Sequence, residues 1–362
     1  MIKYDKIMPQ TNREKKLKIK SKIIGNSHPA LIIAELSANH LHKFDLAVKS
    51  IKAMKDAGAD AVKVQTYTAD TMTINAKNKY FKISQGTIWD GKYLYDLYKE
   101  AYTPWEWQPK LKKYTESLGL IFFSSPFDRT AVDFLEKMDV PAYKIASFEI
   151  TDIPLIEYVA SKKKPVIIST GIATLSDIKE AVAACKRKGN DKIALLKCTS
   201  AYPTLAEEMN LLTIPDMIKR FRTIVGLSDH SMDIAAPVSS VALGARIIEK
   251  HFILDRKLGG PDAKFSLEPK EFKAMVDQIR ITEKALGHAT YELTPKARKS
   301  REHSRSLFVV EDIEKGEALT EKNIRSIRPG FGMHPTYLPE VMGKRAKKDL
   351  KRGTPLEWAL IK

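Results

Sequence analysis

Two short apolar runs of the chain each end in polar residues spaced two apart, Ser228 with His230 and Glu249 with His251. If both runs are β-strands, this spacing places the members of each pair on the same face of a sheet. Two histidines leave most coordination positions of a divalent ion open for water and substrate oxygens. The pattern predicts a metal on His230 and His251, although each could instead be a hydrogen-bonded core histidine. Manganese is our first choice, and magnesium or cobalt would also fit.

Polar side chains also stand at or just after the ends of several other apolar runs. They are Glu35, Lys63, Gln65, Ser125, Lys144, Ser147, Thr199 and Tyr202. A buried lysine is costly unless it is paired, so two lysines with Glu35 and Glu249 indicate a built polar site. Ammonium and hydroxyl groups donate hydrogen bonds to phosphate and carboxylate oxygens. The pattern therefore predicts an anionic ligand held by the lysines and serines.

The scaffold that we expect for these residues is a barrel of alternating strands and helices. Strand-length apolar runs occupy residues 31–35, 61–66, 120–125, 142–147, 165–170, 193–198, 223–228 and 246–252. Segments with helical spacing occupy residues 45–56, 129–138, 154–161, 176–188, 215–221, 235–243 and 269–286. This alternation fits a (β/α)8 TIM barrel, whose chemistry lies at the carboxyl ends of its strands. An open doubly wound sheet competes, but no glycine-rich dinucleotide loop follows the first strand.

Two segments extend the predicted barrel. Residues 17–24 alternate in character around Ser21–Lys22 and predict a small hairpin before the first barrel strand. Residues 67–118 form a connection much longer than a βα unit needs, rich in aromatic side chains. Long ordered loops in compact domains are usually functional, so we expect this insertion to lie over the catalytic face.

The character of the chain changes after residue 287. A polar, basic stretch predicts a linker, and short β-like runs such as Leu307–Val310 and Leu356–Ile361 then alternate with turn residues. A module of this size carries little core of its own. The predicted organisation is a hairpin-plus-barrel domain at 1–287, a linker at 288–304 and a small β-rich domain at 305–362.

Composition limits the cellular setting and the partners. No run is long and apolar enough to span a membrane, and the basic N-terminus lacks the apolar stretch of a secretory signal. The two cysteines make no disulfide framework, so we expect reduced thiols and a cytoplasmic protein. The net charge of +17 comes from lysines scattered along the chain, without a recognisable nucleic-acid motif. We therefore expect no nucleic-acid partner and no membrane.

The chain resembles the sialic acid synthase family almost from end to end. The matching stretches are Ile33–Glu35 with Asn39–His40, Val62–Gln65, Ser125–Asp128, Tyr143–Glu149, Ser169–Gly171, Cys198–Pro203, Gly226–His230, Glu249–Phe252 and Gly260–Asp262. The C-terminal stretch Arg328–Gly332 is similar to the family's antifreeze-like (SAF) domain. Any one of these motifs alone would be weak, but together they are specific.

Within the family, the chain is most similar to the branch that makes pseudaminic acid. The stretch from Ile88 to Trp107 and the run from Asp262 to Glu268 look like that branch. Synthases of N-acetylneuraminic acid and legionaminic acid usually carry a histidine where this chain has Ala263. Those two activities remain the alternatives, with the same chemistry.

The resemblance implies that phosphoenolpyruvate condenses with an open-chain amino-sugar aldehyde and water, giving a nine-carbon 2-keto acid and phosphate. The metal on the two histidines would polarise the aldehyde oxygen, and Glu35 would position or deprotonate the water. The groups expected to hold phosphoenolpyruvate are Lys63, Lys144, Ser125, Ser147 and Ser228. Further substrate contacts are expected from Gln65, Thr199, Tyr202, Glu249 and Asp262, of which Tyr202 and Asp262 would meet the sugar.

The resemblance also implies a domain-swapped homodimer. The SAF domain would cap the partner's barrel, and Arg328 would reach a sugar bound in the other chain.

Two competing readings lead to different tests. In a Schiff-base aldolase, Lys63 or Lys144 would attack a keto acid and leave a borohydride-trapped adduct, without a metal requirement. In a nucleic-acid-binding module, affinity would fall steeply with salt. The condensing synthase instead predicts phosphate release and loss of activity with a chelator.

Overall fold

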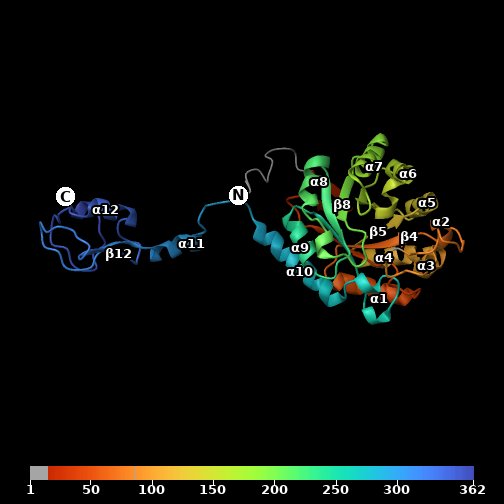
Figure 1. The fold of residues 1–362 in the computed structure, drawn as a ribbon, viewed down its shortest axis with the longest axis horizontal. Helices are drawn as coiled ribbons and strands as arrows, with labels where there is room; N and C mark the ends of the chain where they lie inside the picture. Colours follow the sequence, from red (N-terminus) through yellow and green to blue (C-terminus); the bar gives the residue numbers. More distant parts are fainter. Residues whose placement is uncertain (1–14, 85) are drawn as a thin grey trace. The chain divides into compact units, whose positions relative to one another are not determined.

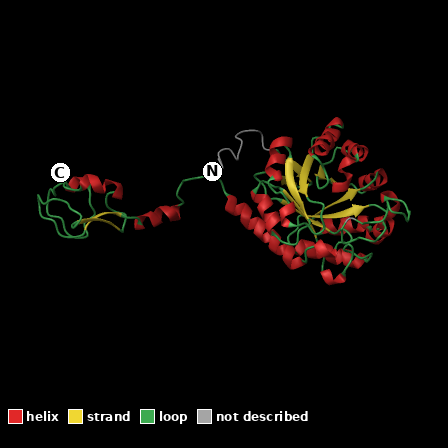
Figure 2. Cartoon of the chain, viewed as in Figure 1, coloured by secondary structure: helices red, strands yellow, loops and turns green. Residues whose placement is uncertain are grey.

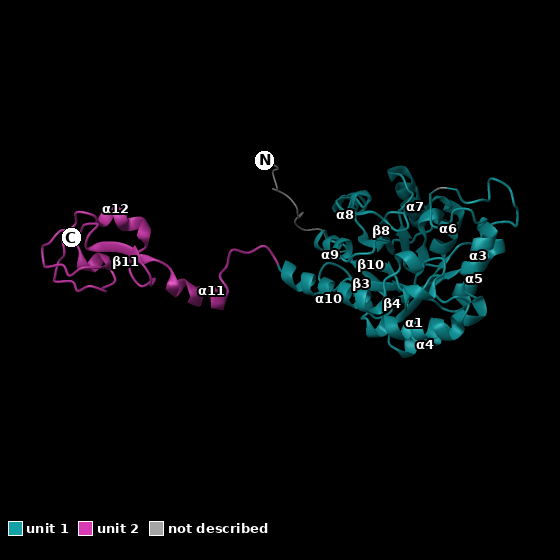
Figure 3. Ribbon diagram, turned by 60° about the horizontal axis from the view of Figure 1, so that its bottom comes forward, with its two compact units in different colours: residues 1–287 teal, residues 288–362 magenta. Residues whose placement is uncertain are grey.

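A computed structural model describes residues 15–84 and 86–362, so the first 14 residues of the predicted barrel domain lie outside the description. The chain divides into two compact units, Met1–Gly287 and His288–Lys362, which Figure 3 shows in two colours. Each unit has its own core. Among the described residues, no helix is long and apolar enough to cross a membrane.

The first unit is built on a closed barrel of eight parallel strands (Figures 1 and 2). The strands are β3 (Leu31–Glu35), β4 (Ala61–Thr66), β5 (Ile121–Pro126), β6 (Tyr143–Ile145), β7 (Val166–Ser169), β8 (Ile193–Cys198), β9 (Ile224–Asp229) and β10 (Ile247–His251). They pair in chain order, and β10 closes the barrel against β3. The TIM barrel predicted from the sequence is confirmed.

Helices surround the barrel on its outside (Figure 2). They are α1 (Phe44–Asp56), α4 (Gln108–Ser117), α5 (Arg129–Lys137), α6 (Ile153–Ser161), α7 (Leu175–Arg187), α8 (Thr213–Phe221), α9 (Ala235–Ala242) and α10 (Pro269–Leu286). Local chemistry fixes several of their first turns. The Asp128 carboxylate accepts hydrogen bonds from two amides at the start of α5, and Thr174 forms a capping box with Asp177 at the start of α7.

The barrel interior is apolar at the amino-terminal ends of the strands. Alternate residues meet there in one cluster, whose members are Leu31, Ile33, Ala61, Ile121, Phe123, Ala142, Ile167, Ala194, Leu196, Ile224 and Ile247. The hairpin of β1 (Leu17–Ile19) and β2 (Lys22–Ile24) closes this end, because Leu17, Ile19 and Ile24 belong to the same cluster. Because side chains alternate with a period of two, further residues of each strand also point into the interior, at the carboxyl ends of the strands.

The predicted insertion at 67–118 extends too far. Its last part is α4, which is one of the helices around the barrel. Only Gln108, Leu111 and Thr115 are buried along α4, so its apolar stripe was too weak to recognise. The insertion proper contains the short α2 (Ala69–Met72) and α3 (Leu94–Ala101).

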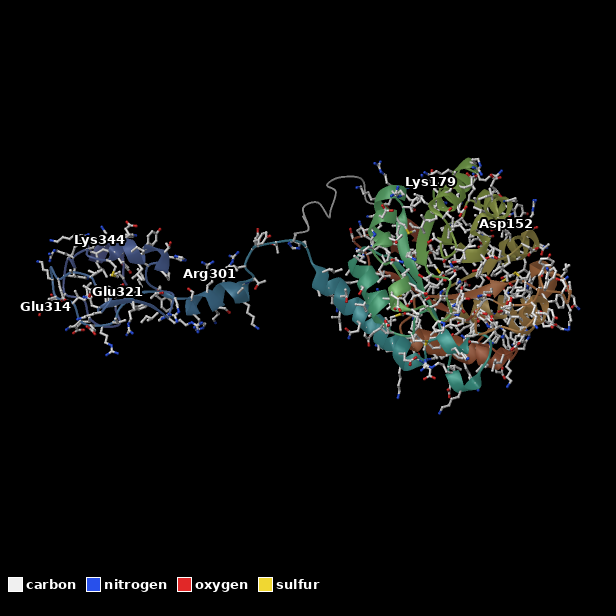
Figure 4. The ribbon with its side chains drawn as sticks, in the orientation of Figure 1. Asp152, Lys179, Arg301, Glu314, Glu321 and Lys344 are labelled. Carbon is white, nitrogen blue, oxygen red and sulfur yellow. The ribbon has the colours of Figure 1, made fainter. Side chains whose placement is uncertain are left out.

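The second unit has a small core of its own around β11 (Ser306–Val309) and β12 (Ile324–Ile327), which pair antiparallel. It also contains α11 (Pro295–Ser300) and α12 (Leu338–Val341). Within residues 356–361, predicted as β-like, Trp358–Leu360 form a 3-10 turn instead, and Ile361 makes an isolated bridge with Ala346. Charged side chains such as Glu314 and Glu321, and Lys179 of α7 in the first unit, are exposed (Figure 4).

Candidate active site

Four buried charges meet inside the barrel at the carboxyl ends of its strands. We call Glu35, Lys63, Lys144 and Glu249 the charged ring. Lys63 Nζ lies 2.8 Å from Glu35 Oε2 and 3.2 Å from Glu249 Oε1, and Lys144 Nζ lies 3.1 Å from the same Glu249 oxygen. The Ser228 hydroxyl donates to that oxygen at 3.1 Å. Glu249 therefore holds both ammonium groups inside the barrel.

The members of the charged ring respond differently to burial. Burial raises the pKa of Glu35 above its ordinary value, and Lys63 offsets only part of this effect. Burial acts on Glu249 in the same direction, but Lys144 and Lys63 outweigh it and lower its pKa to about 2. Glu249 is thus a permanent anion, whereas Glu35 is the carboxyl group best placed to exchange a proton.

A chain of hydrogen bonds through Gln65 and Ser37 connects Glu35 of the charged ring to Asp262. Gln65 Nε2 donates to Glu35 Oε1 at 3.1 Å and to the Ser37 hydroxyl at 2.9 Å. Ser37 in turn donates to Asp262 Oδ2 at 2.5 Å. Burial raises the pKa of Asp262, and the hydrogen bond from Ser37 offsets part of this shift. Ser37 was not among the predicted site residues.

The serines follow the same inward face. Ser125 lies 3.5 Å from Lys63 Nζ, and the Ser147 hydroxyl accepts a hydrogen bond from the Gly171 amide at 3.1 Å. Ser169 is also buried there, and its hydroxyl has no hydrogen-bond partner among the described residues. Because Ser169 stands two residues after the inward-facing Ile167, strand periodicity could have found it.

His230 and His251, the histidine pair, lie beside the charged ring with their ring centroids 5.3 Å apart. His230 Nδ1 donates to the Thr199 carbonyl at 3.1 Å, which leaves Nε2 with a free lone pair in the neutral ring. Burial, together with the nearby His230, holds the pKa of His251 well below its ordinary value. Its imidazole is therefore neutral.

The donor atoms of the histidine pair fit a divalent metal. His251 Nδ1 is buried without a hydrogen-bond partner among the described residues and lies 3.9 Å from Asp262 Oδ2. Across residues 15–84 and 86–362, no group of three or more His, Cys, Asp or Glu side chains is placed to hold a metal ion. A metal here would thus have two protein ligands, with its other positions open to water and substrate.

Cys198, which was not among the predicted site residues, is also buried beside the site. Its sulfur is 3.4 Å from the Ser147 hydroxyl and 4.0 Å from His230 Nδ1. Burial opposes ionisation of the thiol, but His230 and Ser147 lower its pKa to about 7. Burial alone would lower the pKa of His230, but the interaction with Cys198 outweighs burial and raises this pKa above its ordinary value.

Three predicted residues have different surroundings. Tyr202 packs directly on His230, with ring centroids 4.5 Å apart. The Thr199 side chain turns away towards Lys197, and only its carbonyl meets the site. Arg328 belongs to the second unit and is exposed.

Glu149, in the turn after β6, was missed by the sequence analysis. Burial raises its pKa to about 7, and its Oε2 has no hydrogen-bond partner among the described residues.

Together, the fold and the site define a TIM-barrel protein with a two-lysine anion site and a buried histidine pair at the carboxyl ends of its strands. The chain matches the NeuB family over residues 50–291 and the SAF domain over residues 304–362. It belongs to the NeuB family, as the resemblance predicted.

Individual relatives narrow this comparison. The chain is 49% identical over 337 residues to the pseudaminic acid synthase of Campylobacter jejuni subsp. jejuni, covering 92% of this chain and 98% of that protein. It is 48% identical over 329 residues to the pseudaminic acid synthase of Helicobacter pylori, covering 91% and 96%. The solved structure of the N-acetylneuraminic acid synthetase of Leptospira borgpetersenii matches with a TM-score of 0.71 and 32% identity, covering 80% of this chain and 96% of that one.

Proposed function

We propose that the chain condenses phosphoenolpyruvate with 2,4-diacetamido-2,4,6-trideoxy-β-L-altropyranose, in its open-chain aldehyde form, and water to give pseudaminic acid and phosphate. The observation that carries the proposal is that the charged ring lies beside the buried histidine pair on adjoining strands. Both pseudaminic acid synthases named above support the choice of sugar, since each aligns with more than nine-tenths of the chain.

The charged ring is suited to phosphoenolpyruvate. Lys63 and Lys144 present two ammonium groups in a water-poor interior, where their attraction for an anion is strong. Glu249 keeps both groups aimed at one place, and Ser125, Ser147 and Ser228 add hydroxyl donors. Phosphate and carboxylate oxygens of the substrate would meet these donors.

The histidine pair would hold a divalent ion, manganese first and magnesium or cobalt as alternatives. When bound, the ion would act as a Lewis acid for the aldehyde oxygen of the sugar. Asp262 and Tyr202, which lie against His251 and His230, would orient the sugar beside it.

Glu35 would act on the water. The enol carbon of phosphoenolpyruvate adds to the aldehyde carbon, water adds at the substrate's C2, and phosphate leaves from that tetrahedral carbon. A carboxyl group with a raised pKa and a hydrogen bond from Gln65 can hold this water and accept its proton. The ring lysines remain charged partners of the departing phosphate.

The proposal includes a cytoplasmic homodimer in which the SAF domain of each chain serves the barrel of the other. The exposed Arg328 guanidinium would reach the partner's sugar. Mixed dimers of an Arg328→Ala chain with a barrel-inactive chain should recover part of the activity. If mixed dimers never exceed their inactive parents, sharing between chains is refuted.

A phosphate-release assay tests the proposed function. Phosphoenolpyruvate is supplied with the trideoxy altrose sugar, with the corresponding legionaminate precursor or with N-acetylmannosamine, in the presence and absence of a chelator. We expect release with the first sugar only, and loss of release with the chelator. Faster release with another sugar would reassign the substrate, and a borohydride-trapped lysine adduct would favour the aldolase.

A further inference from the structure

One turn of the insertion holds the backbone around Trp89 through several hydrogen bonds. The Asp90 carboxylate accepts hydrogen bonds from the Gly86 and Thr87 amides at 2.9 Å and from the Thr87 hydroxyl at 2.9 Å. The Thr87 hydroxyl in turn accepts from the Trp89 amide at 3.3 Å. Two cross-bonds between Ile83 and residues 91 and 92 close the base of the turn, which fixes the backbone on both sides of Trp89.

The Trp89 side chain reaches across to the loop that follows β10. Its indole Nε1 donates to the Pro261 carbonyl at 2.9 Å, a contact that joins residues 172 positions apart. Its ring centroid lies 5.3 Å from that of Tyr202 and 6.1 Å from that of Phe265. We call these three residues the aromatic wall.

The aromatic wall stands against the histidine pair. Tyr202 lies 4.5 Å from His230 and Phe265 lies 4.9 Å from His251, measured between ring centroids. Tyr202 contacts both His230 and Trp89, so it links Trp89 to the place proposed for the aldehyde. A sugar with C1 at the histidine pair would extend its other end along the wall.

We propose that Trp89 is a specificity-determining residue whose indole face contacts the C6 methyl group of a 6-deoxy amino sugar. This inference rests on the proposed function and names the part of the substrate that the insertion recognises. The only indole donor is already used by Pro261, and Phe265 has no polar atom, so the Tyr202 hydroxyl is the sole polar group of the wall. Against the Trp89 face, which has no free polar atom, a hydroxyl at C6 would lose water without gaining a partner, whereas a methyl group gains contact.

The test compares two sugars that differ only at C6: the trideoxy diacetamido sugar and its analogue with a hydroxyl group at C6. Each is assayed by phosphate release with wild type, Trp89→Ala, Trp89→Phe and Asp90→Ala. Trp105→Phe is the matched control, because Trp105 lies in the same insertion region, donates to the Tyr67 carbonyl and packs on Phe134 away from the histidine pair.

The wild type should prefer the methyl sugar in kcat/KM by about tenfold or more, the range expected for one group in an apolar pocket. Trp89→Ala should reduce this preference at least tenfold through kcat/KM for the methyl sugar, leaving the KM for phosphoenolpyruvate within about twofold. The preference shown by Asp90→Ala and Trp89→Phe should lie between those of wild type and Trp89→Ala. The preference of Trp105→Phe should match that of wild type.

The outcomes separate the two claims. If wild type releases phosphate with neither sugar, the proposed function fails. If wild type acts on the methyl sugar but every soluble Trp89 and Asp90 variant keeps the wild-type preference, the role of Trp89 is overturned. Should Trp89→Ala not fold, the ratios for Trp89→Phe and Asp90→Ala decide, since both variants retain most of the packing.

Discussion

Two groups of buried charges lie on opposite faces of the barrel wall and share only strand β10, and they are built differently. Inside the barrel is the charged ring. Outside it Asp229 and Lys250, which we call the outer pair, form an ion pair with fully buried side chains between β9 and β10. Both Asp229 oxygens accept hydrogen bonds from Ser231, at 2.9 and 3.0 Å, and Lys250 also donates to the Ser231 carbonyl. Every charge of the outer pair has a close partner.

The charged ring is not satisfied in the same way. Glu249 Oε2 and the neighbouring His251 Nδ1 are buried without hydrogen-bond partners among the described residues, and burial raises the pKa of Glu35. An unsatisfied buried polar group costs about 1–3 kcal/mol, so a fold keeps such groups where a ligand will meet them. The outer pair therefore serves the architecture of β9 and β10, whereas the unsatisfied groups of the charged ring fit its proposed role in binding a substrate.

The largest effect is expected when the histidine pair is broken. His251→Ala should abolish phosphate release and remove bound metal, measured by elemental analysis, while the thermal unfolding midpoint stays near that of wild type. His28→Ala, at the amino-terminal end of the barrel, is the control. Wild-type turnover in His251→Ala would refute the metal assignment.

Breaking the outer pair should affect stability rather than substrate binding. Asp229→Ala leaves the Lys250 ammonium buried and unpaired, which typically costs about 3–5 kcal/mol of unfolding free energy. Denaturant unfolding measures this cost. Asp216→Ala, which removes an exposed ion pair with Arg220, should leave the unfolding free energy close to that of wild type. Equal losses in the two variants would contradict the assignment of the outer pair.

Removing one charge of the charged ring should affect substrate binding rather than stability. Lys144→Met should lower kcat/KM for phosphoenolpyruvate by about 30-fold or more, since truncating a buried charged contact costs about 2–5 kcal/mol in binding. Lys192→Met, at the other end of the barrel, should match wild type in the same steady-state assay. An unchanged kcat/KM in Lys144→Met would remove that lysine from the site.

The smallest effect concerns Glu35 and its dependence on pH. Because the folded-state pKa of Glu35 is raised, its ionisation destabilises the folded protein at neutral pH, and this penalty disappears as pH falls below the unfolded-state pKa. Glu35→Gln should therefore raise the unfolding midpoint at pH 7, and the gain should vanish in acid. Turnover should fall at the same time. A Glu35→Gln protein that is less stable at neutral pH would contradict the pKa shift.

The sequence was sufficient for the barrel and for placing several proposed site residues on its inner face, because strand periodicity determines which residues face inward. Glu35, Lys63, Ser125 and Glu249 each follow an inward-facing apolar residue by two positions. The same rule applied to β7, where Ser169 follows the inward-facing Ile167, would have added Ser169. It could not place Trp89, whose contact with Pro261 spans 172 positions and depends on the folded loop alone. The second outer helix, α4, was missed because it buries a single large apolar side chain, Leu111.

The central claim is that the charged ring is the phosphoenolpyruvate site, and a calorimetric titration of phosphoenolpyruvate without sugar tests it most directly. Wild type should bind the ligand, and a Lys63→Met/Lys144→Met double variant should show no measurable binding. The Asp216→Ala variant, with its ring intact, should bind as wild type does. A folded double variant that binds phosphoenolpyruvate as tightly as wild type would contradict the account.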